Sequence, residues 1–333
     1  MLATDIKHYK ANVVTDTSAN GGRVSVNEYV TSGDGMVTIL PDITPAERLA
    51  GITRMRKVFI RNMNSAGEAL YNPKMFLKNP SPSGDLVALK KATATDTQGT
   101  NVATRYYGTC TVTGGSITAG ATTIGITLER SDHNPFVNGD TICLMQLNTD
   151  TLAIVDYEFH SNITVTASGT TGTITLETGD QIMKNYSGTV TVASVIVNDR
   201  TLKPEYNNPL VTSAAGTYAF SEANLYGDNI GTDDDIITLT FTSASAFNAS
   251  SNLFGSLGAG NITTDFAPVH PTFSRPRFTL KKNGFGGVFV SGDTISFEMK
   301  SANFAVFFVN IVPAGISSYK GNKVGFVTTG DTM

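Results

Sequence analysis

The sequence predicts a mostly β protein, made of antiparallel β-sandwich or barrel domains with an extended N-terminal arm. The first observation behind this prediction is a Gly-Asp pair between short apolar segments, at residues 139–140, 179–180 and 292–293, with a truncated copy at 330–331. Glycine adopts positive φ at no steric cost and aspartate hydrogen-bonds to its own turn, so this pair predicts tight turns between strands. The second observation is that charged residues make up 16% of the chain, against roughly 25% in typical soluble domains.

Length and charge narrow the classes of function. The 333 residues are enough for two or three domains with cores of their own. A net charge of −4 gives no general attraction to nucleic acid, so we expect no specific nucleic-acid partner. No stretch approaches the ~18 apolar residues of a membrane span, and the first residues lack the apolar region of a signal peptide. We therefore expect no membrane partner, and a protein that is made in the cytoplasm or is a mature form.

The first elements along the chain are an arm, a short helix and a strand. Residues 1–40 are expected to form the extended arm, with turns at 20–22 and 32–35. A helical turn is expected after Thr44 as N-cap, with Glu47 completing a capping box and Gly51 ending it. A buried strand with basic ends follows at residues 54–62, and further strands are expected at 69–77 and 86–89.

A change of composition near residues 106–108 predicts a separate unit. From there to about residue 194 the chain is rich in Thr and Gly, and its segments 111–142 and 164–182 resemble each other. They represent either an internal duplication or two hairpin units that share a composition bias, and two copies suit a small sandwich or barrel.

The C-terminal third has the strongest β pattern. Residues 201–236 and 243–276 look irregular, whereas strands are expected at 236–242, 277–280, 287–290, 294–299 and 305–312. We predict an arm at 1–40, a main β-domain at 41–107 with 195–333, and an inserted β-domain at 108–194. The alternative is three β-domains in series.

The reactive residue types do not form a recognisable catalytic or metal-binding motif. The four histidines, at positions 8, 133, 160 and 270, lack ligand spacing. We therefore expect no enzyme activity, cofactor or metal. Cys110 and Cys143 are either two buried thiols, which we favour, or one disulfide. The acidic loop at 227–235 is either a solvated surface loop, the favoured interpretation, or a Ca²⁺ site.

A weaker enzymatic hypothesis concerns four carboxylates. A glycoside hydrolase needs two carboxylates that flank the substrate. If the two similar segments of the insert are related by symmetry, Glu129, Asp132, Glu177 and Asp180 would converge.

Basic residues give the sharpest local charge. On a strand, Arg54 and Arg56 fall on one face, and Lys57 and Arg61 on the other. One interpretation is an inter-subunit contact with carboxylates of a neighbour, since Arg favours bidentate pairing; the other is a charged edge that blocks aggregation. A DNA contact is weaker, because four basic residues without a wider patch release few counterions. The full set of candidate inter-subunit contacts is Arg23, Arg48, Arg54, Arg56, Lys57 and Arg61.

Two segments resemble a group of tailed-bacteriophage virion structural proteins. The first contains Asn20-Gly21-Gly22-Arg23, and the second, residues 41–59, fits the pattern P-D-x-x-x-A-E-R-x-A-G-x-T-R-x-R-K-x-F. The resemblance covers mainly residues 12–89 and leaves open a capsid-decoration, neck or collar, tail or baseplate position. It implies an assembly role in the virion, with synthesis in the host cytoplasm, and supplies no catalytic residues.

These observations predict a non-enzymatic virion protein that self-associates and docks onto other virion proteins. A trimer or hexamer is typical of such particles, and nothing in these residues selects one of them. The arm would order against a neighbouring subunit, so a truncation beginning at Pro41 would fold but assemble poorly. The alternative is a surface-exposed carbohydrate-binding β-module for host attachment, located on the insert. Because the chain has no Trp, its aromatic contacts would come from tyrosines at positions 157, 186, 206, 218 and 226.

Overall fold

Antiparallel β-sheets dominate the regular secondary structure of the described residues, which confirms the predicted mostly β fold. The computed structural model describes residues 1–30, 39–317 and 323–332. Every strand pair within these residues is antiparallel. The helical content is one short α-helix and single 3₁₀ turns within the described part of the chain.

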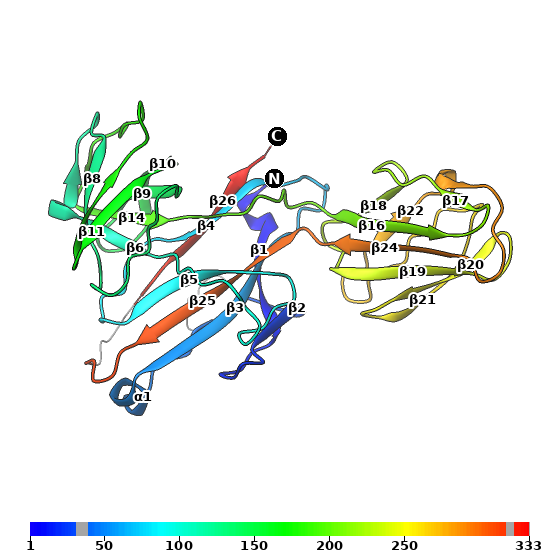
Figure 1. Cartoon of the computed structure of the whole chain (residues 1–333), viewed down its shortest axis with the longest axis horizontal. Helices are drawn as coiled ribbons and strands as arrows, with labels where there is room; N and C mark the ends of the chain where they lie inside the picture. Colours follow the sequence, from blue (N-terminus) through cyan, green and yellow to red (C-terminus); the bar gives the residue numbers. More distant parts are fainter. Residues whose placement is uncertain (31–38, 318–322, 333) are drawn as a thin grey trace.

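Three modules, each with its own apolar core, form an elongated molecule (Figure 1). The central module comprises the described residues within 1–107, 195–202 and 301–332, the inserted module residues 108–194, and the distal module residues 203–300. The chain leaves the central module twice and returns each time, so both outer modules are insertions into it. The predicted main domain was therefore too large: residues 203–300 enclose a separate core. The three modules are also nested in the chain and do not follow one another in series.

The central module is a sandwich of a five-stranded and a three-stranded sheet. The larger sheet has the order β2-β1-β3-β25-β5, with β1 (Ile6–Val13), β2 (Gly21–Tyr29), β3 (Ile52–Asn62), β5 (Leu86–Ala92) and β25 (Asn303–Val312). The smaller sheet has the order β15-β4-β26, with β4 (Tyr71–Leu77), β15 (Ile196–Val197) and β26 (Phe326–Asp331). Side chains such as Ile60 and Phe308 from one sheet pack against Met75 and Leu77 from the other. Strands β3 and β25 are buried along almost their whole length because they lie inside the larger sheet.

The described part of residues 1–40 is not an extended arm. After the 3₁₀ turn η1 (Ala3–Asp5), β1 pairs with β3 from Ile6 opposite Asn62 to Lys10 opposite Val58. Tyr9 and Ala11 are buried against this sheet. The arm prediction failed because β3 needs a hydrogen-bonding partner on this side, and β1 of the same chain supplies it. The turn predicted at 32–35 lies outside the described residues.

The predicted helix is confirmed. Helix α1 (Pro45–Ala50) begins after Thr44, whose hydroxyl accepts a hydrogen bond from the Glu47 amide, while the Glu47 carboxylate accepts from the Thr44 amide. Gly51 ends the helix with φ 77°, a conformation that glycine adopts without strain.

The inserted module is one seven-stranded sheet that curls around its own core. Its order is β10-β9-β14-β6-β8-β12-β11. These strands are β6 (Thr109–Val112), β8 (Thr123–Thr127), β9 (Ile142–Leu147), β10 (Ile154–His160), β11 (Thr164–Ser168), β12 (Thr171–Thr175) and β14 (Thr189–Ser194). The turn η3 (Thr113–Gly115) and the pair β7 (Ser116–Ile117) and β13 (Tyr186–Ser187) complete it. Ile124, Leu144 and Ile174, from separate strands, share the core.

The two similar segments of this module meet in a local two-fold arrangement. Strands β8 and β12, one from each similar segment, pair with Gly125 opposite Thr173. On either side, the Leu128 amide donates to the Thr170 carbonyl at 2.8 Å and the Leu176 amide donates to the Thr122 carbonyl at 2.9 Å. Equivalent residues of the two segments thus make equivalent bonds.

The distal module is a five-stranded sheet covered by two short ribbons. The sheet order is β16-β24-β19-β20-β21, with β16 (Glu205–Thr212), β19 (Asp235–Phe241), β20 (Ala246–Ser251), β21 (Gly255–Asn261) and β24 (Thr294–Lys300). The ribbons pair β17 (Thr217–Tyr218) with β23 (Phe285–Gly286) and β18 (Leu225–Gly227) with β22 (Phe278–Leu280), next to η4 (Lys282–Gly284). A phenylalanine-rich core lies between them, in which the rings of Phe241 and Phe289 stack at 3.8 Å.

Three of the four Gly-Asp pairs form the same turn. Gly139, Gly179 and Gly292 have φ of 88°, 92° and 98°. In each turn the aspartate amide donates to the carbonyl three residues earlier, at 2.9–3.2 Å. The fourth pair, at 330–331, lies within β26 and is not a turn.

Candidate functional site

The basic residues of β3 are buried inside the chain, so they lie neither on a sheet edge nor on an open contact surface. β3 pairs with β1 on one side and β25 on the other, and Arg54, Arg56, Lys57 and Arg61 are each 8% exposed or less. Both interpretations of this run, the inter-subunit contact and the aggregation-blocking edge, were therefore wrong. Their partners come from distant parts of the same chain.

Arg54 and Arg56 fasten the helix and the β1–β2 connection to β3. Arg54 pairs with Glu47 of the capping box and donates to the carbonyl oxygen of Asp42 at 3.0 Å. Arg56 pairs with Asp16 at 2.6 Å and donates to the carbonyl of Thr15 at 3.0 Å. These contacts give both arginines a role within the central module.

Lys57 is neutralised on the opposite face of the strand. Its ammonium group lies 2.8 Å from the Asp96 carboxylate and donates to the carbonyl of Gly22 at 2.7 Å. It also lies over the rings of Phe59 and Phe307. Burial lowers the pKa of Lys57, and Asp96 opposes that shift.

Arg61 reaches from the central module into the distal module. Its guanidinium donates to the carbonyls of Ile230 at 2.7 Å and Thr232 at 2.9 Å, and lies 3.7 Å from the Asp233 carboxylate. The rings of Tyr9 and Phe273 flank it. Burial lowers the pKa of Arg61, although the nearby carboxylate of Asp233 favours the charged form.

The last two predicted contact residues are half-buried and also have partners in the chain. Arg23 donates to the carbonyl of Asp234 in the distal module. Arg48 donates to the carbonyl of Ser317 at 3.3 Å.

A small hollow of about 360 Å³ lies beside Arg48. It is lined by the exposed side chain of Leu49 together with Ile43 and Ile316.

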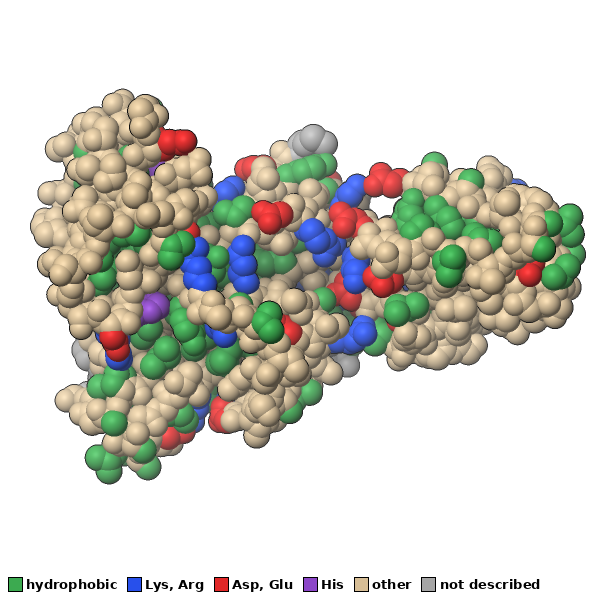
Figure 2. Space-filling view, viewed as in Figure 1, with side chains coloured by type: hydrophobic (Ala, Val, Ile, Leu, Met, Phe, Trp, Pro, Cys, Tyr) green, Lys and Arg blue, Asp and Glu red, His purple; other side chains and the backbone are tan. Residues whose placement is uncertain are grey.

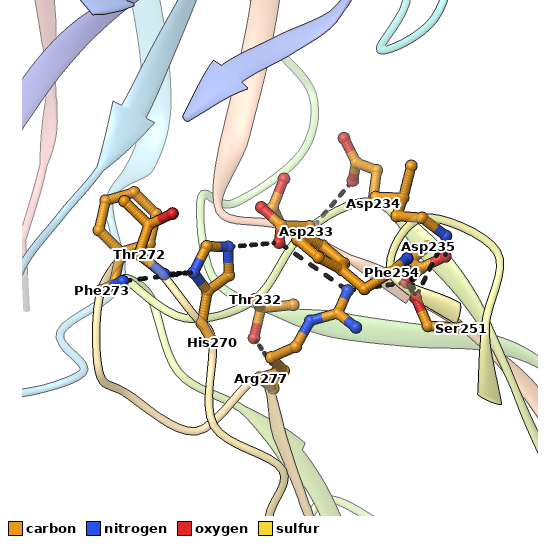
Figure 3. Close-up of polar contacts among 12 residues, drawn as sticks. Thr232, Asp233, Asp234, Asp235, Ser251, Phe254, His270, Thr272, Phe273 and Arg277 are labelled. Carbon is orange, nitrogen blue, oxygen red and sulfur yellow. Dashed lines mark hydrogen bonds and ion pairs between the residues drawn. The ribbon is translucent and has the colours of Figure 1, made fainter. Parts of the chain in front are cut away.

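A buried charge network surrounds Asp233, where Arg61 enters the distal module. Figure 3 shows Asp233 with His270 and Arg277. The Asp233 carboxylate lies 3.0 Å from His270 Nε2 and 3.8 Å from the Arg277 guanidinium. Arg277 also donates to Asp235 at 2.7 Å and lies over the Phe254 ring. The Ser251 hydroxyl donates to the same carboxylate oxygen of Asp235 as Arg277 does.

The backbone around His270 fixes the position of its proton. His270 Nδ1 accepts hydrogen bonds from the amides of Thr272 at 3.0 Å and Phe273 at 3.3 Å. An accepting Nδ1 places the proton of a neutral ring on Nε2, the atom that faces Asp233. Among the described side chains, neither carboxylate oxygen of Asp233 has a partner with hydrogen-bond geometry, so Asp233 is held by charge attraction.

The acidic loop is therefore a structural joint, and neither interpretation of it from the sequence was correct. Asp228 pairs with Arg275 at 2.7 Å, Asp234 accepts from the Ser301 amide at 2.8 Å, and Asp233 and Asp235 are buried. Arg and His side chains occupy the positions around the carboxylates that a cation would take. In the described residues, no group of three or more His, Cys, Asp or Glu side chains could hold a metal ion.

The inserted module meets the central module mainly through apolar side chains, beside an ion pair between Arg105 and Asp140. Phe76 of β4 packs with Cys143, Met145 and Leu147 of β9 and with Ala193 of β14. The ring of Phe159, in the edge strand β10 of the insert, also contacts the ring of Phe76 edge to face, with 5.7 Å between the ring centroids.

Glu129 forms a polar contact at this apolar junction. Its carboxylate accepts a hydrogen bond from the Ser81 amide of the central module. Burial raises the pKa of Glu129 to about 8, and the buried carboxylate of Asp85 adds to the shift.

The four carboxylates of the glycoside-hydrolase hypothesis have separate partners. Glu129 contacts Ser81, Asp132 pairs with Arg130 at 2.5 Å, Glu177 accepts from Asn162 at 3.2 Å, and Asp180 contacts His160 at 2.7 Å. Although Glu129 and Glu177 are at equivalent positions of the two similar segments, their surroundings differ. Glu129 lies at the junction with the central module, and Glu177 lies at the surface.

The two cysteines are free and buried, as favoured from the sequence. Cys110 of β6 lies opposite Val192 of β14, whose other neighbour is Leu144 of β9. One whole strand therefore separates the cysteines, and adjacent strands are about 4.8 Å apart. Cys110 belongs to the insert core and Cys143 to the junction, so the two side chains point to opposite faces of the sheet.

The five tyrosines of the carbohydrate hypothesis separate into three groups. Tyr186 and Tyr218 are buried, whereas Tyr157 is exposed on β10 of the insert. Tyr206 and Tyr226 line a groove of about 510 Å³ at the start of the distal module, together with Gly67 of the central module. This groove therefore lies outside the insert, whereas the hypothesis had located the carbohydrate-binding site on the insert.

The sequence patterns did not indicate Asp16, Asp96 and Asp233 as partners of the basic run, or His270 and Arg277 as the residues that surround Asp233. Arg61 and the Ile230 carbonyl, for example, are 169 positions apart in the chain. One feature of the sequence pointed to the need for such partners. The expected strand combined buried apolar residues with four basic ones, and in a central strand those basic residues need carboxylates from other parts of the chain.

Comparisons of the chain with protein-family models, with curated proteins and with solved structures find no match. No helix in the described part of the chain is long and apolar enough to cross a bilayer.

Proposed function

We propose that this protein is a non-enzymatic structural component of a tailed-phage virion, which self-associates and docks onto other capsid, neck or tail proteins. The resemblance of residues 12–89 to such proteins is the starting point of this proposal. Most of that segment, described as far as residue 30 and again from residue 39, belongs to the central module, the scaffold from which both outer modules project (Figure 1).

The observation that carries the proposal is the role of the residues in the matching pattern. Glu47 caps the helix and pairs with Arg54, Arg56 holds Asp16, and Lys57 holds Asp96. The pattern thus specifies a way of fastening a helix and a hairpin to a central strand. This is an architectural role, which suits a protein that works as a building block.

The surface also supports a role in assembly. The visible face of the inserted module is mostly neutral and polar, whereas charges gather around the middle of the molecule (Figure 2). Large apolar side chains are exposed at separate places: Leu49 on α1, Val155 on β10 and Val288 in the distal module are each more than 60% exposed. Such positions on three different modules suit contacts with several neighbours.

Particle analysis tests the proposal directly. Gradient-purified virions should contain the chain in a fixed ratio to the major capsid protein by quantitative mass spectrometry. Cryo-electron microscopy should then show density for three β modules at regular sites, and light scattering of the purified chain should give a defined oligomer. Absence of the chain from purified particles, or a strict monomer that never associates with them, would contradict the proposal.

A further inference from the structure

A groove at the boundary of the central and distal modules carries an inference beyond assembly. Its volume of about 510 Å³ lies within the roughly 300–1,000 Å³ of small-ligand sites, which often form at domain boundaries. One wall is the beginning of β16, with Tyr206 and Asn207, and the other is the segment from Glu222 to Tyr226. Leu225, which is fully buried, lies beneath.

The aromatic side chains of the groove are held in place by neighbours. Tyr226 lies in β18, which pairs with β22, and is 41% exposed with the Lys281 ammonium 5.9 Å from its ring centre. Tyr206 contacts the ring of Phe220 at 6.0 Å between centroids. Fixed, partly exposed tyrosine rings offer an apolar face together with a polar hydroxyl.

The charges of the groove are balanced within the chain. Lys203 pairs with Glu222 at 2.6 Å, and Glu205 pairs with Arg200 at 3.3 Å. An anionic ligand such as a nucleotide would therefore find no free cation here, and a cationic one no free carboxylate. The carboxylate oxygens and the Asn207 amide still have capacity to accept and donate hydrogen bonds.

A backbone irregularity begins directly after Asn207, at the edge of this groove. The pairing of β16 with β24 shifts register between Asn207 and Leu210, and Asn208 has φ 47°. Bulges of this kind redirect side chains and occur next to functional sites.

We propose that this groove binds a neutral saccharide. A sugar ring presents an apolar C–H face to an aromatic side chain and a rim of hydroxyls that both donate and accept hydrogen bonds. The combination of tyrosine rings, balanced charges and an amide matches that chemistry. The site goes beyond the assembly role and does not depend on it, because the purified chain alone would bind.

A glycan array probed with the full-length purified chain is the first test, using neutral hexose and N-acetylhexosamine oligosaccharides beside acidic ones. We expect binding to neutral members. The best-bound oligosaccharide is then titrated against variants. Tyr226→Ala should weaken binding about tenfold or more, whereas Tyr226→Phe should retain it because the ring remains.

The matched control is Tyr157→Ala, which removes a similarly exposed tyrosine from the insert and should leave affinity unchanged. If Tyr226→Ala misfolds by circular dichroism, Asn207→Ala, at an exposed position, should still weaken binding. Failure of every neutral oligosaccharide to bind, unchanged affinity in Tyr226→Ala, or loss confined to Tyr157→Ala would each overturn the site. None of these outcomes would affect the assembly proposal, which particle analysis tests.

Discussion

The inserted module meets the central module mainly through apolar side chains, with an ion pair between Arg105 and Asp140, whereas the distal module meets it mainly through a network of buried charges. Phe76, Met145 and Leu147 make up much of the first junction; Arg61, Asp233 and Arg277 make up much of the second. Apolar contact stabilises without prescribing direction. A buried charge must meet its partner or remain unpaired at a high free-energy cost, so the second junction depends on one arrangement. We therefore expect the distal module to have the more strictly fixed orientation.

Deleting residues 1–40 should have the largest effect, because it damages the scaffold that both junctions share. It removes β1, buried Tyr9 beside Arg61, and Asn20, which donates to the Met55 carbonyl at 2.7 Å. We expect the truncated chain to lose its cooperative unfolding transition in urea, measured by circular dichroism. A native-like transition would instead restore the idea of a separable arm.

Asp233→Ala should be the most damaging single substitution at the charged junction. It leaves Arg61, Arg277 and His270 without the carboxylate they surround, and breaking a buried ion pair costs about 3–5 kcal/mol. Urea unfolding measures the loss, and limited proteolysis should show new cleavage near residues 203 and 300. The control Asp132→Ala, which removes a surface carboxylate, should change the free energy of unfolding by about 0.5 kcal/mol or less. Equal stability of the two variants would remove the distinction between the junctions.

Phe76→Ala tests the apolar junction. Phe76 is 1% exposed, and truncating a buried phenylalanine costs about 3 kcal/mol or more. New proteolytic cleavage should appear near residues 108 and 194 and leave the boundaries of the distal module protected. The control Leu49→Ala alters a side chain that is 76% exposed and should be nearly neutral. Cleavage at the distal boundaries instead would show that the junctions are not independent.

At pH 5, where the half-buried Glu129 is protonated, Glu129→Gln should have the smallest effect on stability of these substitutions, and its signature is a change in pH dependence. Folded Glu129 has a pKa of about 8 against an ordinary 4.5, so between these values the folded protein keeps a proton that the unfolded chain releases. The contribution of Glu129 to the free energy of unfolding is therefore complete below pH 4.5. It falls by at most about 1.4 kcal/mol per pH unit as pH rises toward 8, and above pH 8 it no longer changes. Glutamine still accepts the Ser81 hydrogen bond but cannot ionise. Urea unfolding at pH 5 and at pH 8.5 measures this fall. The difference in the free energy of unfolding between the two pH values should be smaller in Glu129→Gln than in the natural sequence.

The internal symmetry of the insert supplies the control for that measurement. Glu177→Gln alters the equivalent carboxylate of the second segment, which is exposed, and should leave the pH dependence as in the natural sequence. If both variants behaved alike, burial at the junction would not be the cause of the raised pKa.

The elements that depend on neighbouring residues were predictable from the sequence. The Gly-Asp turns at 139–140, 179–180 and 292–293 and the capped helix after Thr44 follow from backbone freedom and from side chains that bond within three residues. The composition change near residues 106–108 coincides with the point where the chain leaves the central module. These signals are local, so they survive in the linear sequence.

What joins the modules was decided only by the tertiary structure. From the sequence alone, the basic run fits an exposed contact surface. In the structure, β1 and β25 enclose β3, and Asp16, Asp96 and Asp233 from separate segments pair with its basic residues. Likewise, Tyr206 and Tyr226 became the walls of one groove only through the packing of separate segments. Burial and charge pairing depend on which distant strands come together, and local sequence patterns do not encode that choice.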